Sequence, residues 1–193
     1  MTQAPNHDLA KRIQVLEDQL EIQQLAVRYA TAVDARDIDQ LLELFVPDVR
    51  VGRGRSGRDE LRAVLEPQLR LFYRSIHLIC GHRVILQDED RAIGNVYCRA
   101  EHEVGQRWVV IPVRYDDEYR KVNGAWHFSA RRDHHWYEAD VLDRPQSVAF
   151  HDWQSAPPRP SLPESSPKWE AFWHGVDTSG LTTQPVIGEA KDH

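Results

Sequence analysis

The second half of the chain contains four long segments in which apolar and polar residues alternate, and this pattern constrains the fold most. The segments are rich in Val, Ile, Tyr and Trp, which favours β-strands, and they span residues 75–87, 91–104, 107–120 and 125–137. Their connections are short and read "DED", "GQ" and "VNG", the last containing the Asn-Gly pair typical of tight hairpins. Consecutive strands joined by tight turns pair with their neighbours, so the sequence predicts an antiparallel meander.

The first third of the chain has a helical period instead. Apolar residues recur at 4-3-4 spacing near the N-terminus, at Leu9, Ile13, Leu16 and Leu20. This spacing predicts an amphipathic helix over residues 8–35, with Asp8 as its N-cap. Its first turns resemble a short heptad seam, which would pack either against another subunit or over the domain.

Two shorter helices are predicted to follow. Residues 37–45 form one, with Asp37 as its cap and Pro47 as its end. After a brief strand in "VRVG", residues 57–72 form the other, which Pro67 breaks or kinks. Three N-terminal helices followed by a strongly bent meander predict an α+β fold, a cone-shaped barrel with the helices packed on one sheet face.

The composition changes beyond residue 140. The stretch "SAPPRPSLPESSP" is typical of an extended proline-rich linker, and "KWEAFWHG" after it is too short for an independent domain. The tryptophans of this second stretch are expected to dock on the domain or on a neighbouring subunit. We therefore expect a cone domain over residues 1–140 and a Pro/Trp-rich extension over residues 141–193.

Charge and cysteine usage exclude several functions. The net charge of the 193 residues is −6, with both signs interspersed, which argues against a nucleic-acid or membrane partner. The basic run "RVGRGRSGR" is interpreted as a solvated loop, with an anion or partner contact as the alternative. Cys80 and Cys98 lack CxxC spacing and are predicted to be reduced core residues rather than a disulfide or a zinc site. The N-terminus lacks the apolar stretch of a signal peptide, so a cytoplasmic location is expected.

A bent sheet would bring inward-facing side chains together around an apolar cavity. In the strand over residues 91–104, His102 is the one polar member of the apolar face, and His77 lies in the apolar run "SIHLICGH". A bulge near Gly81 is needed to reconcile the two halves of that first strand. In the last strand, alternation groups Arg132 and His134 with the inward face. The expected aromatic walls of the cavity are Trp108, Phe128 and Trp136.

The end of the long helix is predicted to complete the site. Tyr29 and Asp34 are five residues apart and would point about 140° apart on an ideal helix. They share a pocket only if Asp34 lies where the helix ends. A carboxylate accepting from one imidazole nitrogen makes the other a general base near neutral pH. Asp34 with His77 would then form a base, while Tyr29, His102 and His134 would donate hydrogen bonds to an oxyanion or leaving group.

Plainer interpretations exist for each residue. Asp34 can be a turn residue, an inward histidine can be a hydrogen-bonded core residue, and Tyr29 can be ordinary packing. The "DHH" sequence at residues 133–135 suggests a metal site, but adjacent strand residues point to opposite faces, so His134 and His135 do not easily bind one ion together. No G-x-S-x-G elbow is present. The expected site needs neither metal nor cofactor.

Three stretches resemble SnoaL-like proteins of the nuclear transport factor 2-like superfamily. They read "LEDQLEIQQLAVRYATAVDARDIDQLLELFVPDV", "SIHLICGHRVILQDEDRAIGNVYCRAEH" and "YRKVNGAWHFSARR", and the resemblance covers about residues 10–138. Cyclases, isomerases, dehydratases, dioxygenase β subunits and non-catalytic binders share this fold, so the resemblance implies the architecture more than the activity.

Within that superfamily the chain is most similar to cofactor-independent lyases: bile-acid 7α-dehydratase, hexachlorocyclohexane dehydrochlorinase and scytalone dehydratase. The resemblance implies that Asp34 and His77 form the basic pair and that Tyr29 assists them. It also implies an acid in the next strand, assigned to His102 by its face, with Glu101 as the alternative. Some members have an arginine in the last strand. The nearest match here is His134, with Arg132 two residues before it.

These observations predict a dehydratase-type lyase acting on a hydrophobic, cyclic or polycyclic small molecule. One alternative is an isomerase or polyketide-type cyclase that uses the same base. Others are a non-catalytic partner, such as a ring-hydroxylating dioxygenase β subunit, and a ligand-binding module. The open sheet face and the heptad-like helix predict a homo-oligomer, and the resemblance to the lyases favours a trimer.

Overall fold

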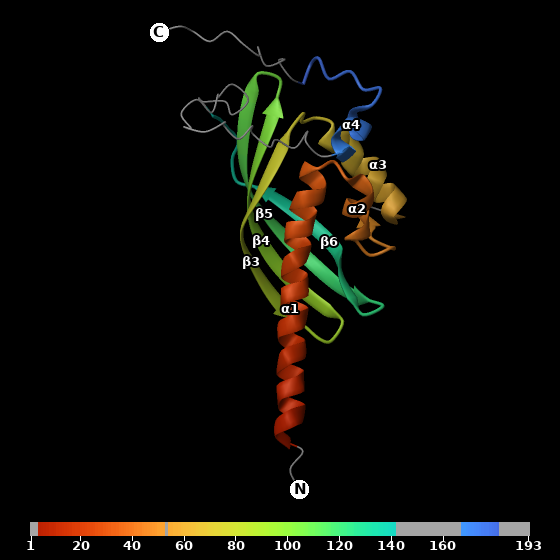
Figure 1. Ribbon diagram of the computed structural model, residues 1–193, viewed down its shortest axis with the longest axis vertical. Coiled ribbons are helices and arrows are strands. Elements are labelled where there is room, and N and C mark those ends of the chain that lie inside the picture. Colours follow the sequence, from red (N-terminus) through yellow and green to blue (C-terminus); the bar gives the residue numbers. More distant parts are fainter. Residues whose placement is uncertain (1–3, 53, 142–166, 182–193) are drawn as a thin grey trace, which may run out of the picture.

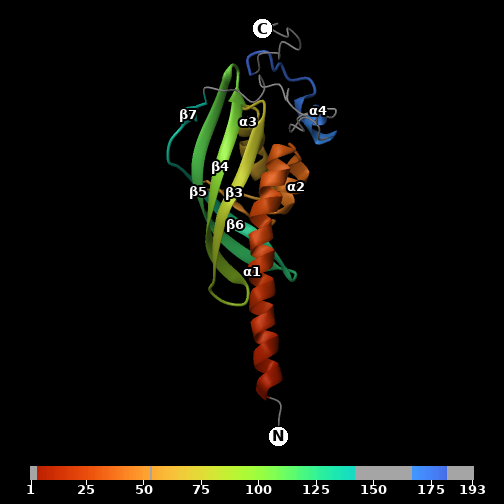
Figure 2. The same ribbon diagram turned by 60° about the vertical axis from the view of Figure 1, so that its left-hand side comes forward.

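The computed structural model describes residues 4–52, 54–141 and 167–181, and shows helices packed on one face of a curved antiparallel sheet (Figures 1 and 2). The main helices are α1 (Ala4–Asp34), α2 (Ile38–Glu43) and α3 (Arg58–Leu69). The main strands are β3 (Ser75–Leu86), β4 (Arg91–Val104), β5 (Arg107–Val122) and β6 (Ala125–His135). The expected α+β class, with N-terminal helices on an antiparallel sheet, is confirmed.

The four strands pair in chain order, β3-β4-β5-β6, as a meander. The expected bulge in β3 is present, because Ile79 pairs with Cys98 and Gly81 pairs with Tyr97. Cys80 is the extra residue of this bulge, and its side chain is exposed rather than in the core as predicted. Cys98 is buried, and both thiols are free.

A second bulge, which we did not expect, lies in β6. Tyr119 of β5 pairs with Phe128, and its neighbour Glu118 pairs with Ala130. Ser129 is therefore the additional residue. Because side chains alternate along a strand, one extra residue exchanges the two faces of β6 from that point on.

Three short strands complete the sheet structure. The strand β7 (Ala139–Asp140) pairs with the start of β5, which lies beyond the part of β5 that pairs with β6. The strands β1 (Arg50–Val51) and β2 (Arg55–Ser56) pair with each other. The basic run interpreted as a loop thus forms a small hairpin, and its first strand is the one predicted in "VRVG".

The helix α1 begins at Ala4, so Asp8 lies inside it and is not its N-cap as predicted. Pro5 is compatible with this start, because a proline in the first turn removes only an N–H that has no partner inside the helix. The helix extends beyond the end of the sheet (Figures 1 and 2). No helix in the described ranges is both long and apolar enough to cross a membrane.

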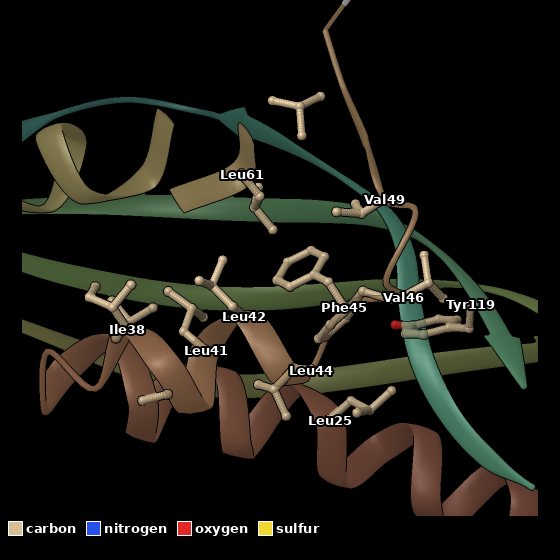
Figure 3. Close-up of a cluster of buried hydrophobic side chains, with 14 of the residues drawn as sticks. Leu25, Ile38, Leu41, Leu42, Leu44, Phe45, Val46, Val49, Leu61 and Tyr119 are labelled. Atoms are coloured by element: carbon tan, nitrogen blue, oxygen red, sulfur yellow. The ribbon is translucent and has the colours of Figure 1, made fainter. Parts of the chain in front are cut away.

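The chain after α1 closes one end of the core. Asp37 caps α2 as predicted, its carboxylate accepting from the Gln40 backbone N–H at 3.2 Å. Leucines of α2 and the residues after it pack between α1 and the sheet, as Figure 3 shows for Leu41, Leu42 and Phe45. The backbone N–H of Val46 donates to Phe128 O at 2.9 Å, which joins this segment to β6 next to the second bulge.

The described part of the C-terminal extension packs on its own domain. The helix α4 (Pro167–Trp173) contributes Trp169, Phe172 and Trp173 to the main buried cluster. The Arg36 guanidinium lies 4.8 Å from the centre of the Trp169 ring. Most of the predicted proline-rich linker lies outside the described residues.

Candidate active site

An apolar cavity of about 390 Å³ lies between the helices and the concave side of the sheet. Aliphatic side chains from α1, α3, β4 and β5, with Phe45 after α2 and Phe72 after α3, form most of its wall. The polar residues that line it are Tyr29, Gln68, His77, His102, Tyr115, Arg131, Asp133 and His135. A largely apolar pocket with a few convergent polar groups is the usual form of a small-molecule site.

The expected contact between Asp34 and His77 is present. Asp34 is the last residue of α1, and its Oδ1 lies 2.7 Å from His77 Nδ1. Its Oδ2 accepts a hydrogen bond from the His77 backbone N–H at 2.9 Å. A carboxylate only accepts, so the imidazole proton belongs on Nδ1 and the Nε2 lone pair is left free.

Arg36 holds the two ends of this pair in place. It adopts a left-handed φ of 57°, which ends α1 just after Asp34. Its buried guanidinium donates to Val33 O at 2.7 Å, to Phe72 O at 2.9 Å and to the Ser75 hydroxyl. The end of α1 is thus tied to the start of β3. Sequence reasoning missed this role, because an arginine between acidic turn residues has the pattern of a solvated side chain.

Tyr29 lies on the cavity wall, and its position resolves the angular difficulty noted in the sequence. Its ring packs edge-on against Phe45, Tyr115 and Phe128, with ring centres 6.0–6.4 Å apart. Asp34 points toward β3 and reaches the site through His77, so the two side chains need not point the same way. Burial raises the pKa of Tyr29, although the Arg131 charge opposes this effect. The hydroxyl is therefore protonated and can donate.

His102 faces the cavity, and Glu101 does not. Glu101 accepts a hydrogen bond from Trp108 Nε1 at 2.8 Å on the opposite face of β4. Trp108 is buried there and does not line the cavity as predicted, because its parity in β5 places it beside Glu101. The His102 ring stacks on Phe72 with 4.2 Å between ring centres, and lies 5.6 Å from the His77 ring.

The surroundings of His102 keep its ring neutral. Burial is the largest cause that lowers the pKa of His102 to about 3, and positive charge on His77, Arg36 and His135 contributes to the same shift. Its Nδ1 has no hydrogen-bond partner among the described residues. His102 is therefore a neutral ring on the cavity wall, and its unpaired Nδ1 is buried.

Neutral burial of His102 should make the protein less stable in acid. An unfolded histidine takes up its proton near pH 6.5, but the folded ring does so only near pH 3. Between these values the unfolded state binds more protons, so the free energy of unfolding falls as the pH falls. When the pH is lowered from 7.5 to 5, the free energy of unfolding of the His102→Gln variant should fall by about 2 kcal/mol less than that of the unmodified protein.

Urea unfolding at both pH values measures this difference. His127→Gln is the matched control, because His127 lies on the other side of the sheet, where its Nδ1 contacts the Ala125 carbonyl at 3.0 Å. Its stability should follow that of the unmodified protein at each pH. An equal fall in the free energy of unfolding in His102→Gln and in the unmodified protein would contradict neutral burial of this ring.

The second half of β6 differs from the prediction. Arg132, His134 and Trp136 were expected to face inward, but the bulge at Ser129 places them on the outer face. Arg132 contacts Glu118 at 3.3 Å and His134 contacts Asp116 at 2.9 Å, while Trp136 packs on Tyr97. Phe128 precedes the bulge and is buried next to Tyr29, but, contrary to the prediction, it is not among the residues that line the cavity.

Arg131 occupies the inward position instead. Its Nε and Nη2 donate to the two oxygens of Asp117 at 2.8 and 2.7 Å. Its guanidinium carbon lies 4.2–4.3 Å from the ring centres of Tyr29, Tyr115 and Phe128. Burial alone disfavours the charge, but the Asp117 carboxylate outweighs it and raises the pKa of Arg131. A fixed cation therefore lies at the cavity wall.

One signal in the sequence points to Arg131. Asp117 shares its face of β5 with Tyr115 and Val113, so alternation places a carboxylate in an apolar interior. A buried carboxylate needs a cation. The neighbouring strand offers Arg131 or Arg132, and only Arg131 reaches Asp117 once the bulge is included.

A second histidine–carboxylate pair lies at the cavity rim. Asp133 Oδ2 is 3.0 Å from His135 Nε2, and both side chains are more than half exposed. The predicted separation of His134 from His135 onto opposite faces is present. Within the described residues, no group of three histidine, cysteine or acidic side chains is arranged to hold a metal ion.

Comparison with known proteins agrees with this architecture. A family model of the SnoaL-like domain matches residues 14–132. An uncharacterized protein of Mycobacterium tuberculosis (strain ATCC 25618 / H37Rv) is 31% identical over 124 residues, which are 60% of this chain and 84% of that protein.

Solved structures show the same fold. Hexachlorocyclohexane dehydrochlorinase LinA-type3 from Novosphingobium barchaimii LL02 superposes with a TM-score of 0.60 at 20% identity, covering 68% of this chain and 94% of that one. A putative scytalone dehydratase from Novosphingobium aromaticivorans DSM 12444 gives a TM-score of 0.60 at 22% identity, covering 69% and 93%. At these identities the likeness establishes the fold alone. The family model, which matches more than half of the residues, shows that the chain belongs to the SnoaL-like domain family.

Proposed function

We propose that the protein is a cofactor-independent lyase that eliminates water, or another small leaving group, from a hydrophobic cyclic substrate. The observation that carries this proposal is the His77–Asp34 pair, with its 2.7 Å contact, at the wall of an apolar cavity. The fold neighbours that are a dehydrochlorinase and a putative scytalone dehydratase support the reaction class.

The geometry supports proton abstraction by His77. Its Nε2 would take a proton from a carbon next to a carbonyl group, and Asp34 would stabilise the imidazolium that forms. The electrons of the broken C–H bond would form the new double bond as the bond to the leaving hydroxyl breaks. The proton held by His77 would then leave with the hydroxyl as water, which returns the base to its starting state.

Other polar groups of the cavity would stabilise charge in this reaction. Tyr29 is a protonated donor, and His102 is a neutral ring with an unpaired nitrogen. Arg131 lines the cavity, and its buried Nη1 has no hydrogen-bond partner among the described residues, so its positive charge would stabilise a negative substrate oxygen. Such donors stabilise the negative charge that develops on the carbonyl and leaving oxygens when they are fixed before the reaction starts.

Product mass tests the proposal. The protein is incubated with a panel of cyclic β-hydroxy ketones and β-chloro ketones, and the products are followed by mass spectrometry and NMR. We expect loss of water or hydrogen chloride from at least one compound, and a rate about 10²–10⁴-fold lower in His77→Gln. His127→Gln, outside the cavity, should retain full activity.

The same experiment separates the rival functions. A product of unchanged mass that incorporates solvent deuterium would assign the protein to the isomerases or cyclases, which use the same base. Full turnover in His77→Gln would remove His77 from the mechanism. Binding without any product from the panel would favour a ligand-binding module and count against the lyase.

A further inference from the structure

The back of α1 carries a heptad seam that nothing in the described structure covers. Five apolar side chains occupy it and are each between 46% and 64% exposed: Leu9, Ile13, Leu16, Leu20 and Val27. With Leu9 at a d position, they alternate between d and a positions over three heptads, and Gln23 holds the remaining d position. Single exposed leucines are ordinary, but a seam about 27 Å long in which five of the six core positions are apolar is not.

The seam faces away from the domain to which α1 belongs. The residues of α1 that are buried against the sheet include Ile22, Leu25 and Ala26. At 100° per residue, their direction and that of the seam differ by about 150°. The first turns of α1 also extend beyond the sheet (Figures 1 and 2). A second helix can therefore lie along the seam without meeting the domain of the first chain.

We propose that the seam pairs with the same seam of a second copy, in a parallel two-stranded coiled coil. The side chains themselves favour this arrangement. Ile13 and Val27 are β-branched and lie at a positions, while Leu9 and Leu16 lie at d positions. β-Branched residues at a with leucine at d favour two parallel strands. The trimer expected from the resemblance to lyases would need another surface.

Charge complementarity fixes the direction of the pairing. Arg12 is at a g position and Glu17 is at the following e position. In a parallel dimer each g residue faces the next e residue of its partner, so two Arg–Glu pairs form by symmetry. Neither residue takes part in an ion pair within the described part of the chain. In an antiparallel dimer g faces g and e faces e, and these attractive pairs are lost.

Sedimentation equilibrium of the full chain tests the proposal. We expect a dimer, and the Leu16→Glu variant should raise its dissociation constant at least about a hundredfold, because one charge enters each side of the seam. Leu16 is 64% exposed in one chain, so circular dichroism should show an unchanged fold. Val15→Glu is the matched control, since Val15 is also exposed but lies at a c position outside the seam.

Charge exchange and cross-linking test the direction. Arg12→Glu should weaken the dimer, and the double variant Arg12→Glu/Glu17→Arg should restore it. On a Cys80→Ser background, Leu9→Cys should form an intermolecular disulfide on mild oxidation, because equivalent d residues lie side by side only in a parallel dimer. Lys11→Cys, at an f position on the side of α1 opposite to the seam, should not form this disulfide.

The opposing outcomes are equally definite. A monomer, a trimer or an assembly that Leu16→Glu leaves intact would overturn the proposal, the last by placing the contact outside the seam. A cross-link that requires Leu9→Cys on one chain and Leu20→Cys on the other would replace the parallel arrangement by an antiparallel one, and so would overturn it.

Discussion

Replacing Asp34 with asparagine should lower turnover of the elimination substrate by about three orders of magnitude. The Asp34 carboxylate accepts two hydrogen bonds from one residue, from His77 Nδ1 at 2.7 Å and from the His77 backbone N–H at 2.9 Å. Asparagine has one oxygen and one NH₂ group. Its oxygen would satisfy the backbone N–H, and its NH₂ group would then face the ring nitrogen.

This exchange reverses the tautomer of His77. An NH₂ group donates, so Nδ1 would become the acceptor and the proton would move to Nε2. The nitrogen that should take the substrate proton would already carry one. Nitrogen-15 NMR of the imidazole reports this change without any substrate: the pyridine-like nitrogen should be Nε2 in the unmodified protein and Nδ1 in Asp34→Asn.

Asp37→Asn is the matched control for this variant. Asp37 lies three residues away and caps α2 through its 3.2 Å contact with the Gln40 N–H. Asparagine caps helices about as well as aspartate, so stability and turnover should both be close to those of the unmodified protein. Turnover in Asp34→Asn within tenfold of the unmodified protein would show that the carboxylate does not set the tautomer.

The largest expected loss of stability follows from replacing Arg131 with methionine. Asp117 is fully buried, and its two oxygens accept from Arg131 at 2.8 and 2.7 Å. Removing the cation leaves a buried carboxylate whose remaining hydrogen-bond donor among the described residues is the Tyr119 hydroxyl, at 2.9 Å. Breaking one partner of a buried ion pair typically costs about 3–5 kcal/mol. Urea unfolding at neutral pH should show a loss of this size.

Two further variants separate the ion pair from the packing of the side chain. Arg131→Met/Asp117→Asn should recover most of the loss, because the buried charge is gone and Tyr119 keeps an acceptor. Arg132→Met should change the free energy of unfolding by less than about 1 kcal/mol, since Arg132 is exposed and contacts Glu118 at 3.3 Å. Equal losses in Arg131→Met and Arg132→Met would contradict the inward position of Arg131.

The contrast between these two arginines shows where sequence reasoning reached its limit. Alternation placed His102 correctly, because β4 pairs with both β3 and β5 without a register shift from Cys98 to His102. The same reasoning failed for Arg132 and His134, because Ser129 adds one residue to β6. The run "SARRDHH" alternates equally well in either register. Only pairing with Glu118 and Tyr119 of β5 fixes which residues face inward.

The helix termini show the same contrast between features set by local sequence and features set by long-range contacts. Asp37 and Pro47 carry local signals, and the short helix between them was predicted from those signals. The end of α1 at Asp34 was inferred, but its physical cause was not: Arg36 adopts a left-handed conformation because it bonds to Phe72 and Ser75, which lie far along the chain. Contacts of that kind depend on the finished fold and leave no periodic trace in the sequence.

Because α4 packs on Arg36, part of the support for the proposed base lies outside the family domain. The family match ends at residue 132, yet the guanidinium that holds the end of α1 stacks on Trp169, well beyond it. Two proteins alike throughout the matched region can therefore differ in how firmly they hold an equivalent of Asp34. Changes in the C-terminal extension alone would then alter how rigidly the proposed Asp34–His77 pair is held, without any change in the common fold.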